Sequence, residues 1–228
     1  MKKILPFTLL ALVFAGAGVA RATTPDRKDL VSEVQSCYAI LQEFMSWPTT
    51  AIPPEVWKSA KAVVIVNQFK AGFIFGIKGG YGVILVKKPS GQWSLPVLLN
   101  ANEASFGLQA GAKSVETIFI MTDSQTPRLL FHQRLNIGID AKAVVGPKAA
   151  DAEKDNRPLL AAPVLVYSKE AGLFAGATVK AAQLARDDDA NDALYNTTNT
   201  LPELLYSDWV QPPAELQPFI NYVQRLSP

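Results

Sequence analysis

The residues best suited to chemistry stand in one stretch, residues 70–88, which reads KAGFIFGIKGGYGVILVKK and holds five glycines. Glycines beside a lysine are the residue types that cradle phosphate, so nucleotide binding is the first hypothesis. The Walker pattern fails because Lys78 is followed by glycine rather than by Ser or Thr. The dinucleotide fingerprint fails because Leu85 stands where its third glycine belongs and a strand, not a helix, is expected to follow. We therefore expect the glycines to let neighbouring strand backbones approach closely and the sheet bend.

Lysines and aromatic residues alternate with these glycines. Lysines at strand ends discourage edge-to-edge pairing, and that structural role would explain them. The functional alternative is a membrane surface, where lysines meet lipid phosphates and aromatic rings enter the interface. The candidate lipid-binding residues are Lys58, Lys61, Lys70, Phe73, Phe75, Lys78, Lys87 and Lys88.

The acidic run that begins at Asp187, DDDAND, matches the first, third and fifth positions of a calcium loop. The sixth position is Asp192 instead of Gly, and the twelfth is Thr198 instead of Glu. The run is better explained as the acidic first turn of a helix, where it complements the helix dipole. A weak surface cation site at Asp187–Asp192 stays open.

Catalytic groups are scarce. His132 is the only histidine, which excludes a site with several histidine ligands, and no Gly-x-Ser-x-Gly elbow is present. Cys37 is the only cysteine and lies on the apolar side of a helical pattern, so we expect a buried core residue and no intrachain disulfide. We therefore predict no enzymatic activity, no cofactor and no metal centre.

The N-terminus has the pattern of a secretory signal peptide. A positive MKK, an apolar core and the small-x-small sequence ARA predict cleavage after Ala22 and export to a bacterial periplasm. Loss of residues 1–22 removes three cationic residues and leaves 19 basic and 20 acidic residues. This balance provides no global positive field, so nucleic acid is not an expected partner.

The elements that must position these residues can be read from hydrophobic periodicity. Apolar residues at helical spacing predict an amphipathic helix over 27–47 and another over 212–226. Between them lie a short helix from Pro54 and β-branched segments separated by turns, with a short helix near 123–133 and an exposed loop over 149–157. We expect an α+β fold: a strongly bent, mainly antiparallel sheet or barrel-like core with amphipathic helices at both chain ends. The division is a signal peptide (1–22), an N-terminal helix and linker (23–53), and one domain (54–228).

Five segments follow one another along the chain: SAKAVVIVNQFKAGFIFGIKGGYGVILVKKPSGQWSLPVLL (59–99), SFGLQAGAKSVETIFIMT (105–122), LNIGIDAKAVVGP (135–147), YSKEAGLFAGATV (167–179) and RDDDANDALYN (186–196). In this order they resemble the SYLF-domain family, the lipid-binding domain called an actin-binding domain in yeast relatives. Two positions depart from the family pattern, since Ala62 and Asn196 stand where the family usually has glycine. The positions that match the family motif, and that the resemblance makes structural, are Gly72, Gly76, Gly80, Gly82, Gly107, Gly111, Gly172, Gly176, Asn191 and Tyr195.

The resemblance implies a β-rich domain that binds lipid. Its eukaryotic members bind phosphoinositides, and some bind actin, but neither ligand is expected in a bacterial periplasm. The sequence therefore predicts a non-enzymatic protein that binds lipid or an anionic membrane surface, through the helix over 27–47 or through the lysine–aromatic segment. The alternative is a scaffold module that binds an envelope protein.

Overall fold

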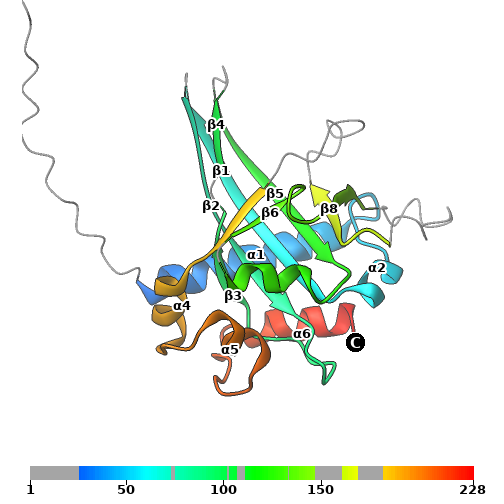
Figure 1. Ribbon diagram of the computed structural model, residues 1–228, viewed down its shortest axis with the longest axis vertical. Coiled ribbons are helices and arrows are strands. Elements are labelled where there is room, and N and C mark those ends of the chain that lie inside the picture. The colour runs from blue at the N-terminus through cyan, green and yellow to red at the C-terminus, as the bar shows by residue number, and fades with distance from the viewer. Residues whose placement is uncertain are drawn as a thin grey trace, which may run out of the picture.

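The computed structural model describes residues 26–72, 75–101, 103–106, 111–132, 134–146, 161–168 and 182–228. The expected signal peptide and the loop expected over 149–157 lie outside these residues. Within them, nine strands form one sheet (Figure 1). The strands are β1 (Ala62–Gly72), β2 (Phe75–Val86), β3 (Val97–Asn100), β4 (Glu103–Phe106), β5 (Gly111–Met121), β6 (Arg134–Ile137), β7 (Ala143–Val145), β8 (Val164–Ser168) and β9 (Ala182–Arg186).

The strand order shows that the sheet curls almost into a barrel. The order is β6-β9-β3-β2-β1-β5-β8-β7, with β4 paired to β2, and the described pairings are antiparallel except β7 with β8. The two outermost strands, β6 and β7, are joined by residues 138–142 alone. Eight strands laid flat would span roughly 34 Å, whereas a connection of that length reaches roughly 20 Å at most. The edges must therefore curve toward each other, which confirms the bent, mainly antiparallel sheet.

Close backbone approach explains two of the glycines. A Cβ placed on Gly80 would lie 2.6 Å from the carbonyl oxygen of Asn67, and one on Gly82 would lie 2.9 Å from that of Ile65. Both obstacles are backbone atoms of the neighbouring strand β1, which cannot move aside as a flexible side chain can. At these two positions the sheet requires glycine for packing, as the sequence predicted.

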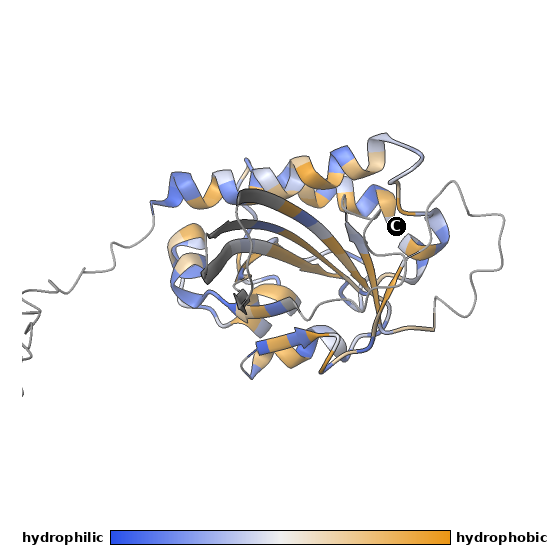
Figure 2. Cartoon of the chain, turned by 90° about the horizontal axis from the view of Figure 1, so that it is seen from above, coloured by the Kyte–Doolittle hydropathy of each residue, from blue (hydrophilic) through white to orange (hydrophobic). Residues whose placement is uncertain are grey.

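Helix α1 (Arg27–Ser46) lies along the curved sheet (Figure 2). The side chain of Asp26 caps its first turn by accepting a hydrogen bond from the backbone N–H of Lys28. Its apolar face is buried and belongs to the same hydrophobic cluster as the strands. The buried residues are Leu30, Val34, Cys37, Ile40, Leu41 and Phe44.

The remaining helices surround the lower half of the sheet in Figure 1. They are α2 (Pro54–Ser59), the 3-10 helix η1 (Thr126–Phe131), α4 (Asp188–Tyr195), α5 (Leu201–Tyr206) and α6 (Gln217–Leu226). Helix α6 also supports α1, because the ring of Phe219 stacks on Tyr38 at 5.2 Å between centroids. Helix α5 was not predicted, although Thr200 and Glu203 form a capping box at its start. None of the helices in the described residues is long and apolar enough to cross a bilayer.

Candidate functional site

The structure divides the candidate lysines between the two ends of strand β1. Lys61 immediately precedes β1, whereas Lys70 lies near its far end, nine residues later. At about 3.3 Å per residue these positions are roughly 30 Å apart along the strand. One small ligand therefore cannot contact both groups.

Two of the four lysines near the start of β1 are engaged within the protein. Lys87 Nζ donates to the carbonyl oxygen of Pro228 at 2.5 Å, and Lys88 Nζ donates to Ser207 O at 2.9 Å and to Asp208 Oδ1 at 2.6 Å. Desolvation, followed by the charge of the nearby Lys61, lowers the pKa of Lys87. These bonds fasten the C-terminal segments to the sheet and favour a structural role. The other two, Lys58 and Lys61, are exposed.

The far end of the sheet brings three lysine positions into one row. Lys70 on β1 pairs with Lys78 on β2 and with Lys113 on β5, while Lys78 also pairs with Glu103 on β4. Directly opposite residues share a face and have Cβ atoms about 5 Å apart. We call Lys70, Lys78 and Lys113 the lysine row. Lys113 was missed from the sequence, because only the register of β5 brings it beside the other two.

The opposite face at this end carries phenylalanine positions. Phe69 on β1 alternates with Lys70, and Phe75 on β2 pairs directly with Phe106 on β4. Residues of odd number on β1 and β2 occupy the face opposite the lysine row, because successive strand residues alternate between faces. This end of the sheet is thus amphipathic, with lysine positions on one face and phenylalanine positions on the other. Phe73, the other aromatic candidate, lies outside the described residues.

The backbone of residues 76–82 rules out the phosphate cradle. These residues form the middle of β2, paired to β1 and β4, and not a loop before a helix. Positive φ angles among the described residues occur at Gly91, Gly138 and Asn196. Gly72 pairs with Gly111, and Gly76 pairs with Ser105. The motif glycines Gly107, Gly172 and Gly176 lie outside the described residues.

Asn191 and Tyr195 act as a structural clamp. Asn191 is 2% exposed; its Oδ1 accepts from Leu98 N at 2.8 Å and its Nδ2 donates to Leu98 O at 2.9 Å. One turn later, Tyr195 Oη donates to the carbonyl oxygen of Pro96. The carboxamide thus satisfies the backbone of β3 as a neighbouring strand would. Burial raises the pKa of Tyr195, so its hydroxyl remains a proton donor at neutral pH.

Asn196 adopts a left-handed conformation, with φ of 50°, at the end of α4. Glycine and asparagine tolerate this region best, which explains why asparagine can replace the glycine usual in the family.

The acidic run caps a helix as expected. Asp187 accepts from the backbone N–H of Ala190, and Asp188 pairs with Arg186. Within the described part of the chain, no group of three or more metal-ligating side chains gathers at one point.

Cys37 and His132, the two remaining candidates for a catalytic role, are separate from each other. Cys37 is fully buried and its Sγ donates to Ile65 O, and burial raises the pKa of its thiol. His132 is exposed at the end of η1. Their surroundings give neither residue a catalytic partner among the described residues.

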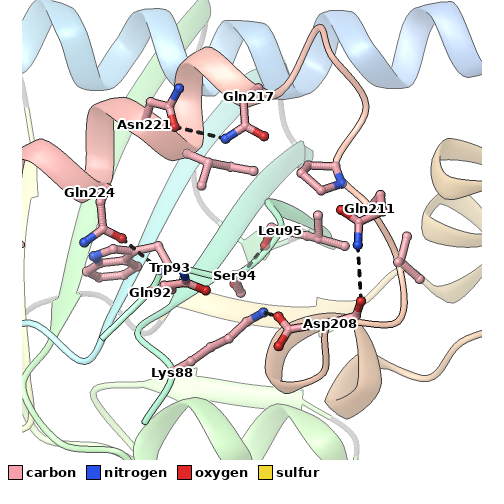
Figure 3. A pocket seen from close by; sticks show the side chains of 13 residues that line it. Lys88, Gln92, Trp93, Ser94, Leu95, Asp208, Gln211, Gln217, Asn221 and Gln224 are labelled. Atoms are coloured by element: carbon pink, nitrogen blue, oxygen red, sulfur yellow. Dashed lines mark hydrogen bonds and ion pairs between the residues drawn. The ribbon is translucent and has the colours of Figure 1, made fainter. Parts of the chain in front are cut away.

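A cavity of about 510 Å³ was not anticipated from the sequence (Figure 3). It lies between residues 88–95, the segment after α5, and helix α6. Five carboxamide side chains line it: Gln92, Gln211, Gln217, Asn221 and Gln224.

The described residues thus form a curled α+β sheet with lysine positions on one face of its far end and phenylalanine positions on the other. The family model described as "Ysc84: Las17-binding protein actin regulator" matches residues 102–226, more than half of the chain. The chain therefore belongs to the Ysc84 family, whose domain is the SYLF domain.

Curated relatives agree with this assignment. LAS seventeen-binding protein 3 of Saccharomyces cerevisiae is 28% identical over 208 residues, covering 88% of this chain and 45% of the relative. An SH3 domain-containing protein of Schizosaccharomyces pombe is 30% identical over 198 residues, covering 83% and 46%. SH3 domain-containing YSC84-like protein 1 of Xenopus laevis is 27% identical over 195 residues, covering 82% and 58%. The chain thus spans about half the length of these relatives. No solved structure matches.

Proposed function

We propose that this protein binds anionic membrane surfaces without catalysis, through the amphipathic end of its sheet. The lysine row carries this proposal. Three like charges at directly opposite positions destabilise a sheet, and Glu103 is the only acid that the described register places in the row. An anionic surface would relieve this repulsion.

The location of the row supports a surface ligand over a small buried one. In Figure 1 the ends of β1, β2, β4 and β5 extend beyond the helices. Lysines near an anionic bilayer contribute about 1 kcal/mol each, and aromatic residues favour the interface. The phenylalanine positions on the opposite face would enter the lipid while the lysines meet the phosphates.

Helix α1, the other contact considered, is a weaker candidate. Its apolar face already packs against β1 and β2, so binding lipid would require it to leave the core. Fully burying each large apolar side chain contributes about 2 kcal/mol, and α1 buries several. Detachment would therefore cost far more than the contact could return.

We further propose that the protein is exported, with cleavage after Ala22. The charged, apolar and small-residue segments at the N-terminus support this. The intact mass of protein recovered from a cell envelope fraction tests it: a mass corresponding to residues 23–228 is expected, and retention of residues 1–22 would refute cleavage.

Vesicle flotation tests the binding proposal. The protein is mixed with vesicles of phosphatidylcholine alone or with an equal part of phosphatidylglycerol, and we expect flotation only with the anionic mixture. Lys70→Glu and Lys78→Glu should abolish it, while Lys142→Glu, at an exposed lysine before β7, should not. No flotation in either mixture would refute the proposal. If crosslinking in intact cells then captures one envelope protein, the scaffold alternative replaces it, in keeping with relatives named for protein binding.

A further inference from the structure

The cavity beside α6 has a balanced charge. Among the described residues that line it, Lys88 and Asp208 are the only charged ones, and they pair at 2.6 Å. A charged ligand would therefore find no uncompensated partner. An apolar ligand would strip water from the carboxamides without replacing their hydrogen bonds, which is unfavourable.

Several polar atoms of the wall remain available to a ligand. Gln217 Nε2 donates to Asn221 Oδ1 at 2.9 Å, which leaves Gln217 Oε1 and Asn221 Nδ2 unengaged by the described residues. Asp208 uses Oδ1 for Lys88, and its side chain is 81% exposed. The carboxamide of Gln92 makes no hydrogen bond within the described part of the chain. Figure 3 shows these side chains around the same space.

One wall of the cavity is held in place by hydrogen bonds. Gln224 accepts from Trp93 N at 3.2 Å, and Trp93 Nε1 donates to Ser227 O at 2.9 Å, which fixes one wall. Leu95 and Ile220 add apolar surface between the polar groups.

We propose that this cavity binds a neutral, polyhydroxylated ligand, of the class of a small saccharide. A hydroxyl both donates and accepts, as a carboxamide does, so neighbouring carboxamides match neighbouring hydroxyls. The apolar residues suit the C–H face of a sugar ring, and Trp93 adds an aromatic side chain to the same wall. A volume of about 510 Å³ falls within the range of about 300–1,000 Å³ that small-molecule sites occupy.

Nuclear magnetic resonance of the four tryptophan indole N–H groups tests this proposal. The probes are cellobiose and N,N′-diacetylchitobiose, with trialanine as the peptide comparison. We expect at least one disaccharide to shift the Trp93 signal saturably and to leave those of Trp47 and Trp57 unchanged, because neither of these residues lines the cavity. Absence of a saturable shift with both disaccharides, or tighter binding of trialanine, would overturn it.

Variants on α6 supply the second readout. The double variant Gln217→Ala and Asn221→Ala should weaken disaccharide binding by about five-fold or more, as expected when neutral hydrogen bonds are lost. The matched control is Gln35→Ala, at an exposed carboxamide on α1, which should bind as the parent does. Equal affinity of the double variant and the parent would also overturn the proposal. Vesicle flotation of the double variant should be unchanged, because the lysine row is at the other end of β1.

Discussion

The lysine row leads to the prediction that one substitution raises the stability of the fold and weakens membrane binding. Lys70 has a lysine directly opposite on each side, in Lys78 and Lys113. Two unit charges held at the Cβ spacing of about 5 Å would repel by about 0.8 kcal/mol in water, and physiological salt roughly halves this; because lysine side chains are long and flexible, this value is an upper limit. Replacing Lys70 by Gln removes both repulsions. We therefore expect Lys70→Gln to raise the free energy of unfolding, by at most about 0.8 kcal/mol.

The same substitution should weaken membrane binding. One lysine near an anionic surface contributes about 1 kcal/mol, so Lys70→Gln should bind anionic vesicles about five-fold less tightly. Urea unfolding measures the first effect and vesicle flotation the second. Lys142→Gln is the control, since it removes the same charge from an exposed position outside the row.

Salt provides the check on the cause. The stability gained by Lys70→Gln should shrink at about 1 M salt, where the screening length falls to about 3 Å. A variant that is less stable than the parent, or that floats equally well, would refute the reasoning that the row is kept for an anionic ligand at a cost in stability.

Other substitutions test how the fold is held together. Asn191→Ala should lower the free energy of unfolding by about 3 kcal/mol, because it leaves buried backbone groups of β3 unpaired, and a urea midpoint equal to the parent's would disprove the clamp. Gly80→Ala should cost about 2–4 kcal/mol because its Cβ meets backbone, and thermal unfolding at the parental temperature would contradict that packing. Asn196→Gly should add roughly 0.5 kcal/mol by removing a left-handed strain, and a destabilised variant would count against it. Burial, with the charges of Asp187 and Asp29, raises the pKa of Glu33 above its ordinary value of 4.5. The folded state therefore favours the protonated carboxyl, and the free energy of unfolding falls as pH rises above about 4.5. Glu33→Gln should therefore match the parent in urea unfolding at about pH 4 and exceed it at about pH 7; equal stability at both would exclude this carboxyl as the cause.

Much of the architecture followed from local patterns. Helical spacing of apolar residues identified α1 almost to the residue, because one face of that helix is entirely buried. A phosphate-binding loop was excluded because the glycine and lysine spacing matches no such motif. Gly80 and Gly82 then proved to be sites of close backbone approach. These inferences succeeded because periodicity and the absence of a Cβ act over a few residues.

The arrangement across the sheet could not be predicted in this way. Lys70 and Lys113 are 43 positions apart in the chain, and only strand pairing makes them neighbours. The same holds for Asn191, whose family motif was visible while its partner, the backbone of Leu98, was not. The cavity beside α6 could not be predicted from any local pattern, because three separate segments of the chain form it.

Site-specific fluorescence tests the central claim most directly, because the lone Cys37 is buried with its thiol pKa raised and should not compete for a label. An environment-sensitive fluorophore is attached at Ala104→Cys, on β4 opposite Ile77, and in a second protein at Gln35→Cys on α1. With vesicles of equal phosphatidylglycerol and phosphatidylcholine, we expect the emission at position 104 to shift to the blue and that at position 35 to stay constant. A shift at position 35 with none at position 104 would contradict binding through the end of the sheet.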